Sequence, residues 1–284
     1  MTTVPSPLEL VELPFMRTAV EEILLLAVAG GLLGTWIVLR RLAFFAHAAG
    51  GATFPGLVVA DAAGIRPVLA ALAVALAYAG GVHRTGMRSG GRVTDAATGL
   101  LLVAALAVGV ILASDVFASG ARVDQLLFGT LLGLDAGDLG AAAAAAIVAI
   151  GATVTLGPAW LAAGFDRDGA RAIGTRVGAA DALLLALVAA SVVTALPAVG
   201  ALLTTALFIV PAATVRLVAR SVPELLLGSV GLAALEGVAG VYVALWADAA
   251  PGPAIAVLGA AVYALVAAGR ALSGREPRAE AVAA

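Results

Sequence analysis

The feature that most constrains this chain is a series of long apolar segments separated by short connections. A bilayer core about 30 Å thick requires about 20 mainly apolar residues in a helix. Pro197 and Gly200 separate two of the segments, as a break between spans or as a kink in one long hairpin. We therefore predict an all-α, polytopic helical membrane protein with eight or nine transmembrane helices. The candidate spans are 19–39, 44–61, 66–82, 95–113, 138–160, 180–196, 199–215, 225–246 and 253–269.

The arginines fall on alternate connections, and this alternation predicts the orientation. One set of connections carries three of them, Arg17, Arg66 and Arg122. The other set carries thirteen: Arg40, Arg41, Arg84, Arg88, Arg92, Arg167, Arg171, Arg176, Arg216, Arg220, Arg270, Arg275 and Arg278. Positively charged connections remain in the cytoplasm, so we expect the amino end outside and the carboxyl end in the cytoplasm. The expected parts are an extracytoplasmic tail (1–18), a transmembrane domain (19–270) and a cytoplasmic tail (271–284).

Composition excludes several classes of protein. Hydrophobic residues make up 62% of the chain and charged residues 12%, about half the charged share of a soluble domain. The chain has no lysine, so it lacks the G-x-x-x-x-G-K-[ST] loop that binds phosphate in ATPases. Without cysteine it has no thiolate metal site, and a net charge of −2 indicates no nucleic-acid partner. An intramembrane enzyme is disfavoured because neither H-E-x-x-H nor G-x-S-x-G occurs.

Two connections are longer than the others. Residues 114–137 lie on the predicted outer side and include QLLFGTLLGL, which is too short to cross the bilayer and predicts a re-entrant or surface helix. Residues 161–179 lie on the predicted inner side, carry charges and are interrupted by glycines. Their composition alone fits an ordinary solvated connection equally well.

Several motifs occur in an order that is typical of one transporter family. The inner connection, FDRDGARAIGTRVG, is similar to an F-D-x-x-x-A-x-x-x-G stretch, with Asp166, Ala170 and Gly174 at the matching positions. Further similar segments are RRLAFFAHAAGGATFPGLVVA (40–60), QLLFGTLLGLDAGDL (125–139), VGALLTTALFIVPAATVRLVAR (199–220) and DAAPGPAIAVL (248–258). Together they resemble the ABC-type zinc/manganese permease family over nearly the whole chain.

This resemblance implies a function and a set of partners. It implies the permease subunit of an ATP-driven importer for divalent metal ions, zinc or manganese, in the bacterial inner membrane. A second copy or close homologue, a cytoplasmic ATP-binding-cassette ATPase and an extracytoplasmic metal-binding protein are the expected partners, besides membrane lipid. ATP hydrolysis is expected on the separate ATPase, the metal is the transported substrate, and no cofactor is expected on this chain. The residues expected to contact the ATPase lie in the connection 161–179: Phe165, Asp166, Ala170, Arg171 and Gly174.

One departure from the family pattern leaves the substrate open. When Arg40–Arg41 and Pro55–Gly56 are aligned, the family's aspartate falls at His47 and its metal-associated histidine falls at Gly51. The usual Asp and His pair is therefore absent, and zinc, manganese, iron or a metal chelate remain as substrates. An ion-coupled secondary transporter is the alternative class, although it usually has internal repeats and a midplane ion site.

Polar residues inside the spans are the candidates for the translocation path, because a charge in the bilayer is costly and is a functional candidate by default. Glu236 is either a metal-contacting carboxylate that faces a partner subunit or a protonated or hydrogen-bonded helix contact. His47 is either a transient metal ligand near an inner gate or a packing histidine.

Prolines and threonines add candidates of lower specificity. Pro55 and Pro211 are expected inside the helices over 44–61 and 199–215, where a proline removes a backbone hydrogen bond and favours a kink. Thr204 and Thr205 either line the path or form packing hydrogen bonds. The glycines of Gly30–Gly34 and Gly237–Gly240 are expected to allow close helix crossings.

Overall fold

The computed structural model describes residues 14–88, 93–116, 134–200 and 204–273, and every regular element within these ranges is helical. The first half contains α2 (Pro14–Leu39), α3 (Ala43–Gly51), α4 (Phe54–Ala63), α5 (Pro67–Arg88), α6 (Asp95–Ile111) and the π-helical turn η1 (Leu112–Val116). The second half contains α8 (Ala136–Phe165), α9 (Arg167–Ala172), α10 (Val177–Thr194), α11 (Leu196–Val199), α12 (Thr204–Arg216), α13 (Val222–Ala247) and α14 (Pro251–Leu272).

The predicted membrane architecture is confirmed for the described residues. Eight candidate spans are long and apolar enough to cross a bilayer, and one of them, Ala43–Ala63, takes in both α3 and α4. Helix α12 is a shorter apolar helix of 13 residues. The expected break near Pro197 is present, since α10 ends at Thr194 and Gly200 after α11 has a φ of 86°. Most of the predicted outer connection 114–137 lies outside the described residues.

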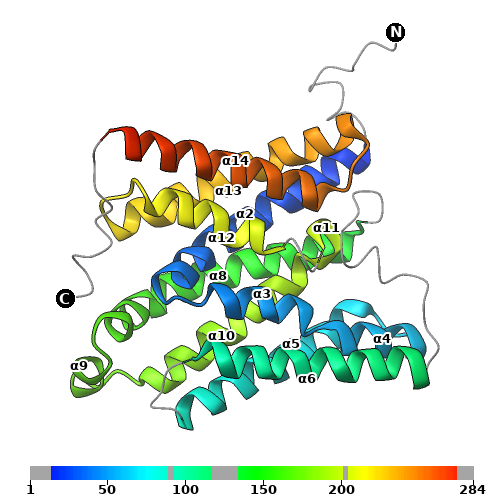
Figure 1. The fold of residues 1–284 in the computed structure, drawn as a ribbon, viewed down its shortest axis with the longest axis horizontal. Helices are drawn as coiled ribbons and strands as arrows, with labels where there is room; N and C mark the ends of the chain where they lie inside the picture. Colours follow the sequence, from blue (N-terminus) through cyan, green and yellow to red (C-terminus); the bar gives the residue numbers. More distant parts are fainter. Residues whose placement is uncertain (1–13, 89–92, 117–133, 201–203, 274–284) are drawn as a thin grey trace.

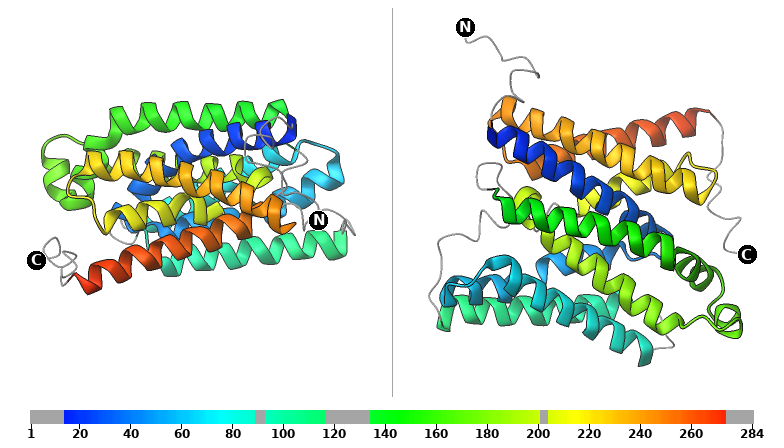
Figure 2. Two further views of the ribbon diagram at one scale, coloured as in Figure 1. Left: turned by 90° about the horizontal axis from the view of Figure 1, so that it is seen from above. Right: turned by 180° about the vertical axis from the view of Figure 1, so that it is seen from behind.

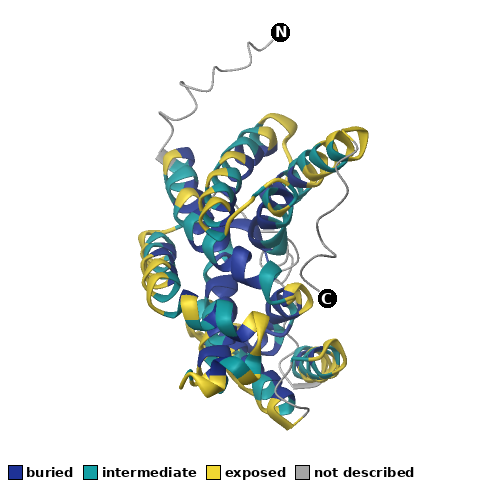
Figure 3. Ribbon diagram, turned by 90° about the vertical axis from the view of Figure 1, so that its left-hand side faces the viewer, coloured by how far each residue is buried: buried dark blue, intermediate teal, exposed yellow. Residues whose placement is uncertain are grey.

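Helix α2 occupies the middle of the bundle and contacts α8, α12 and α13 (Figure 1). The view from behind in Figure 2 shows the long helices lying side by side in the same general direction. Seen from one end, the buried segments gather in the centre and the exposed ones form the rim (Figure 3). The long helices begin and end at two opposite ends of the bundle (Figure 1). We call the one that carries Arg40, Arg88, α9, Arg216 and Arg270 the arginine-rich end, and it lies on the left of Figure 1.

Glycines allow close contacts between helices, both around the central helix α2 and between α13 and α14. A Cβ atom placed at Gly31 would lie 2.5 Å from the Cα of Val230 in α13, and one at Gly34 would overlap the carbonyl oxygen of Phe208 in α12. A Cβ at Gly240 would lie 2.8 Å from the Cα of Ile255 in α14. Small residues are what let helix backbones approach in a membrane, so the predicted glycine faces are confirmed.

The structure corrects the expected position of Pro55. A single helix was predicted over 44–61, but α3 ends at Gly51 and α4 begins at Phe54. Pro55 therefore lies in the first turn of α4, where the missing N–H would have no helical partner in any case. Ala52 and Thr53 separate the two helices, although both residues keep right-handed helical backbone angles. Pro211, in contrast, lies inside α12 as predicted.

Helix α8 is capped at its first turn, which lies at the end of the bundle opposite the arginine-rich end (Figure 1). The carboxylate of Asp135 accepts hydrogen bonds from the backbone N–H of Asp138 (2.9 Å) and Gly137 (2.6 Å). These bonds favour the charged form and hold the pKa of Asp135 below its ordinary value. Because the folded-state pKa is lowered, the stabilising effect of this cap is present at neutral pH and is lost as the pH falls through that pKa.

Candidate functional site

The connection predicted to contact an ATPase folds into a short helix, α9, at the arginine-rich end. Asp166 caps this helix by accepting hydrogen bonds from the backbone N–H of Asp168 and Gly169, each at 3.0 Å. Gly174, with a φ of 84°, closes the turn after the helix in a left-handed conformation that favours glycine. Ala170 is buried and packs with Ala163 and Val177. Of the predicted residues, Asp166 thus caps the start of this helix and Gly174 closes the turn after it. Burial of Ala170 packs the helix against the ends of α8 and α10.

The outer surface of this connection is apolar and charged. Phe165 is 72% exposed and Ile173 is 77% exposed, so two large apolar side chains project from the arginine-rich end. Arg171 is exposed, and its ion pair within the described residues is local, with Asp168 at 2.9 Å. Sequence reasoning included Phe165 and Arg171 but missed Ile173. The signal available was an isolated isoleucine between charged residues and a glycine.

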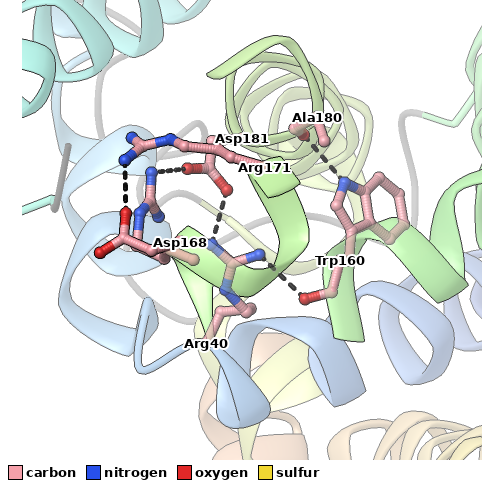
Figure 4. Close-up of polar contacts among 7 residues, drawn as sticks. Arg40, Trp160, Asp168, Arg171, Ala180 and Asp181 are labelled. Atoms are coloured by element: carbon pink, nitrogen blue, oxygen red, sulfur yellow. Dashed lines mark hydrogen bonds and ion pairs between the residues drawn. The ribbon is translucent and has the colours of Figure 1, made fainter. Parts of the chain in front are cut away.

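A buried ion-pair cluster connects α9 to the transmembrane helices (Figure 4). Asp181 in α10 lies 2.5 Å from Arg40, which follows α2, and 2.7 Å from Arg167 in α9. Arg40 also donates to the carbonyl oxygen of Trp160 in α8 (3.1 Å), whose indole N–H donates to the carbonyl of Ala180 (2.8 Å). Asp181 was not among the predicted site residues.

His47 lies on α3 with an exposed side chain. Its Nδ1 is 3.5 Å from the hydroxyl of Thr205 in α12, which is the polar contact the structure gives it. Thr205 is partly exposed, whereas Thr204 is buried and donates to the carbonyl of Gly200 at 2.6 Å. The structure therefore brings together His47 and Thr205, while Thr204 closes the turn between α11 and α12.

Glu236 lies inside α13 and is buried within the single chain, next to Gly259 of α14. This burial is compatible with the reading of Glu236 as a helix contact, and its role in a translocation path stays a prediction. Among the described residues, its Oε1 has no hydrogen-bond partner, and the same holds for both carboxylate oxygens of Glu22 in α2. Glu22 was missed at the sequence level because it adjoins Glu21 and Arg17 in what resembles a charged boundary. Buried polar groups without partners are uncommon and require an explanation.

The described residues contain no group of three or more His, Cys, Asp or Glu side chains placed to hold a metal ion. His47 and Glu236 have separate surroundings, Thr205 for the first and Gly259 for the second. A tightly bound zinc or manganese ion normally needs three or more nitrogen or oxygen ligands.

The comparisons with known proteins decide the family. The model of the ABC 3 transport family matches residues 12–270. The chain belongs to the ABC 3 transport family. It is therefore a multi-pass membrane protein and the permease subunit of an ABC transporter, consistent with its eight candidate spans.

Relatives in this family match nearly the full length of the chain. The "Manganese transport system membrane protein MntC" of Halalkalibacterium halodurans is 27% identical over 258 residues, covering 90% of this chain and 88% of the relative. The "Probable metal transport system membrane protein" of Thermotoga maritima is 32% identical, with 88% of each chain covered. The structure of PsaBC from Streptococcus pneumoniae in complex with Fab has a TM-score of 0.79 and 24% identity, covering 91% of this chain and 93% of that one. This last likeness shows a shared permease fold.

Proposed function

We propose that this ABC 3 family permease imports a divalent metal ion, with manganese as the leading substrate. The observation that supports this most strongly is the family match over residues 12–270, together with relatives named as manganese transport proteins. The absence of the family's Asp and His pair at His47 and Gly51 makes zinc, iron and a metal chelate the competing substrates. An ion-coupled secondary transporter is disfavoured by family membership.

The proposed assembly contains two copies of the chain, a cytoplasmic ATP-binding-cassette ATPase and an extracytoplasmic metal-binding protein. The arginine-rich end is the proposed cytoplasmic side, since positively charged connections remain there. This places the amino end outside, the carboxyl end in the cytoplasm and α9 against the ATPase. Phe165 and Ile173 supply the apolar contacts and Arg171 the charged contact of that docking surface.

The proposed mechanism separates metal capture from metal passage. ATP binding closes the ATPase, displaces α9 and tilts the attached helices so that the path opens to the outside. The metal delivered by the binding protein then passes His47 and Thr205, and hydrolysis resets the helices. A path residue needs to hold the ion only weakly, because tight binding here would slow release. A single candidate ligand on α3, His47, is consistent with tight metal capture by the binding protein and weak contact during passage.

The test of this function is the metal content of cells that lack the protein. We expect manganese, measured by elemental mass spectrometry under metal limitation, to fall selectively and to return with the wild-type gene. A selective fall in zinc or iron would keep the importer and change its ion. An unchanged metal profile, with a normal level of the ATPase partner in the parent strain, would contradict a metal importer.

Substitution of His47 and Glu236 tests the two path candidates. We expect His47→Ala to lower manganese uptake by about tenfold, the lower end of the roughly 10- to 100-fold loss that follows removal of a group supporting a metal ligand. Glu236→Gln keeps the side-chain volume and removes the carboxylate, so uptake is expected to fall while the level of folded protein is unchanged. Wild-type uptake in His47→Ala would remove that residue from the path. A lower protein level in Glu236→Gln, with normal uptake per molecule, would assign Glu236 to helix packing.

A further inference from the structure

The ion-pair cluster at the arginine-rich end has an asymmetry that bears on how α9 is attached. Asp181 uses one carboxylate oxygen for Arg40 and the other for Arg167. The side chains of Asp181 and Arg40 are each 10% exposed and that of Arg167 is 16% exposed. Such pairs interact strongly, and removing one partner leaves a buried charge unpaired. Exposed pairs, in contrast, contribute little.

The two arginines differ in what else holds them. Arg40 has a second partner, the carbonyl oxygen of Trp160, and Trp160 is itself fixed by its bond to Ala180 and by an edge-to-face contact with Trp36 at 5.4 Å. Arg167 depends on its ion pair with Asp181, because neither its Nε nor its Nη2 forms a hydrogen bond in the part of the chain that the structure describes. Loss of Asp181 would therefore release α9 more than it would loosen α2, α8 and α10.

Arg40 connects the ion-pair cluster to the turn between α2 and α3. Arg40 follows the last residue of α2, and the next residue, Arg41, has a φ of 55° at the turn into α3. Non-glycine residues rarely adopt this left-handed conformation. Helix α3 begins at Ala43 and carries His47. A movement of α9 is thus connected through Arg167, Asp181 and Arg40 to the turn that sets the position of α3.

We propose that Asp181 is a positioning residue that transmits the displacement of α9 to the α2–α3 turn, and so links ATP hydrolysis to opening of the metal path. This inference rests on the proposed function, since it assumes that an ATPase acts on α9. Among the ion pairs of the described residues, Arg17–Glu21 and Arg171–Asp168 are local to one helix. The two pairs of Asp181 are the ones that join separate helices.

The test uses the full complex of permease and ATPase with the metal-binding protein, reconstituted in liposomes with Mn²⁺. Arg167→Gln removes the ion pair between α9 and Asp181 and leaves the pair between Asp181 and Arg40, so it carries a smaller risk to folding than a substitution of Asp181. Asp181→Asn removes both ion pairs without changing the sequence of α9. We expect both variants to lower the Mn²⁺ transported per ATP hydrolysed by about tenfold, within the roughly 5- to 150-fold range of coupling between sites. In both variants, the amount of ATPase bound to the permease and the rate of ATP hydrolysis are expected to stay close to wild type. Asp181→Glu keeps the carboxylate, so its ratio of Mn²⁺ transported to ATP hydrolysed is expected to lie above that of Asp181→Asn.

Arg88→Gln is the matched control, because it removes one positive charge at the same end. Arg88 is exposed and forms no ion pair within the described residues. An unchanged ratio in both Arg167→Gln and Asp181→Asn would overturn the inference, as would loss of the ATPase from both complexes, since that result indicates a purely structural role. Failure of the wild-type complex to transport Mn²⁺ with ATP would instead contradict the proposed function.

Discussion

Replacing Gly34 with alanine is expected to destabilise the protein strongly, although alanine is the better helix former. The added Cβ would overlap the carbonyl oxygen of Phe208 in α12, and backbone atoms move only with their whole helix. The gain in helix propensity is about 1 kcal/mol, whereas forcing extra atoms into a packed site costs about 1–3 kcal/mol and more when the obstacle is rigid. We expect a net loss of about 2 kcal/mol or more, measured as a lower unfolding temperature of the detergent-solubilised permease.

Gly151→Ala is the matched control for this prediction. Gly151 lies within α8, and a Cβ atom there would meet nothing within 4 Å. Its replacement is expected to leave the unfolding temperature unchanged or to raise it slightly, since only the helix-propensity gain remains. Equal unfolding temperatures for the two variants would show that α2 and α12 are not as close as the structure places them.

Arg171→Glu is expected to uncouple ATP hydrolysis from transport. Arg171 lies on the exposed side of α9 and pairs only with Asp168, three residues earlier. The substitution replaces this attractive pair with two like charges on a six-residue helix and reverses the charge at the proposed ATPase contact. Charge reversal at a docking surface costs more than neutralisation, because juxtaposed like charges repel. The expected result is loss of the stimulation of ATP hydrolysis by the metal-loaded binding protein, with transport reduced by about tenfold or more.

Arg88→Glu makes the same charge change at the end of α5, outside α9. We expect this control to retain both stimulation and transport. Normal stimulation in Arg171→Glu would contradict the assignment of α9 as the coupling helix. A low level of both variants in the membrane would indicate that either charge reversal interferes with insertion, because inner connections depend on positive charge.

The sequence predicted well those features that depend on local composition. A helix that crosses a bilayer needs a continuous apolar stretch, so the spans were visible as runs of Ala, Leu and Val, and eight long apolar helices are present. The break near Pro197 was likewise visible, because proline restricts the local backbone and glycine adopts conformations that other residues rarely reach. The family resemblance directed attention to residues 165–178, and α9 occupies Arg167–Ala172 within that segment.

The sequence was less informative about polar residues whose partners are distant in the chain. Arg40 and Asp181 are separated by 141 positions, and nothing in the segment VGAADALLL indicates that its aspartate is buried between two arginines. Glu236 stood out because it lies in an apolar run, but that run does not indicate which residues bury it, such as Gly259 in α14. Pro55 was placed inside one helix because a run of small apolar residues shows no boundary, whereas the structure divides it into α3 and α4.

The sequence by itself determined that the chain crosses a membrane many times, and its motif order indicated the transporter family. The physical reason is that transfer into lipid and helix breaking are local properties, set within about 20 residues. Only the tertiary structure decided which residues meet: Asp181 with Arg40 and Arg167, His47 with Thr205, and Gly34 with the backbone of Phe208. These contacts depend on how helices from distant parts of the chain pack together.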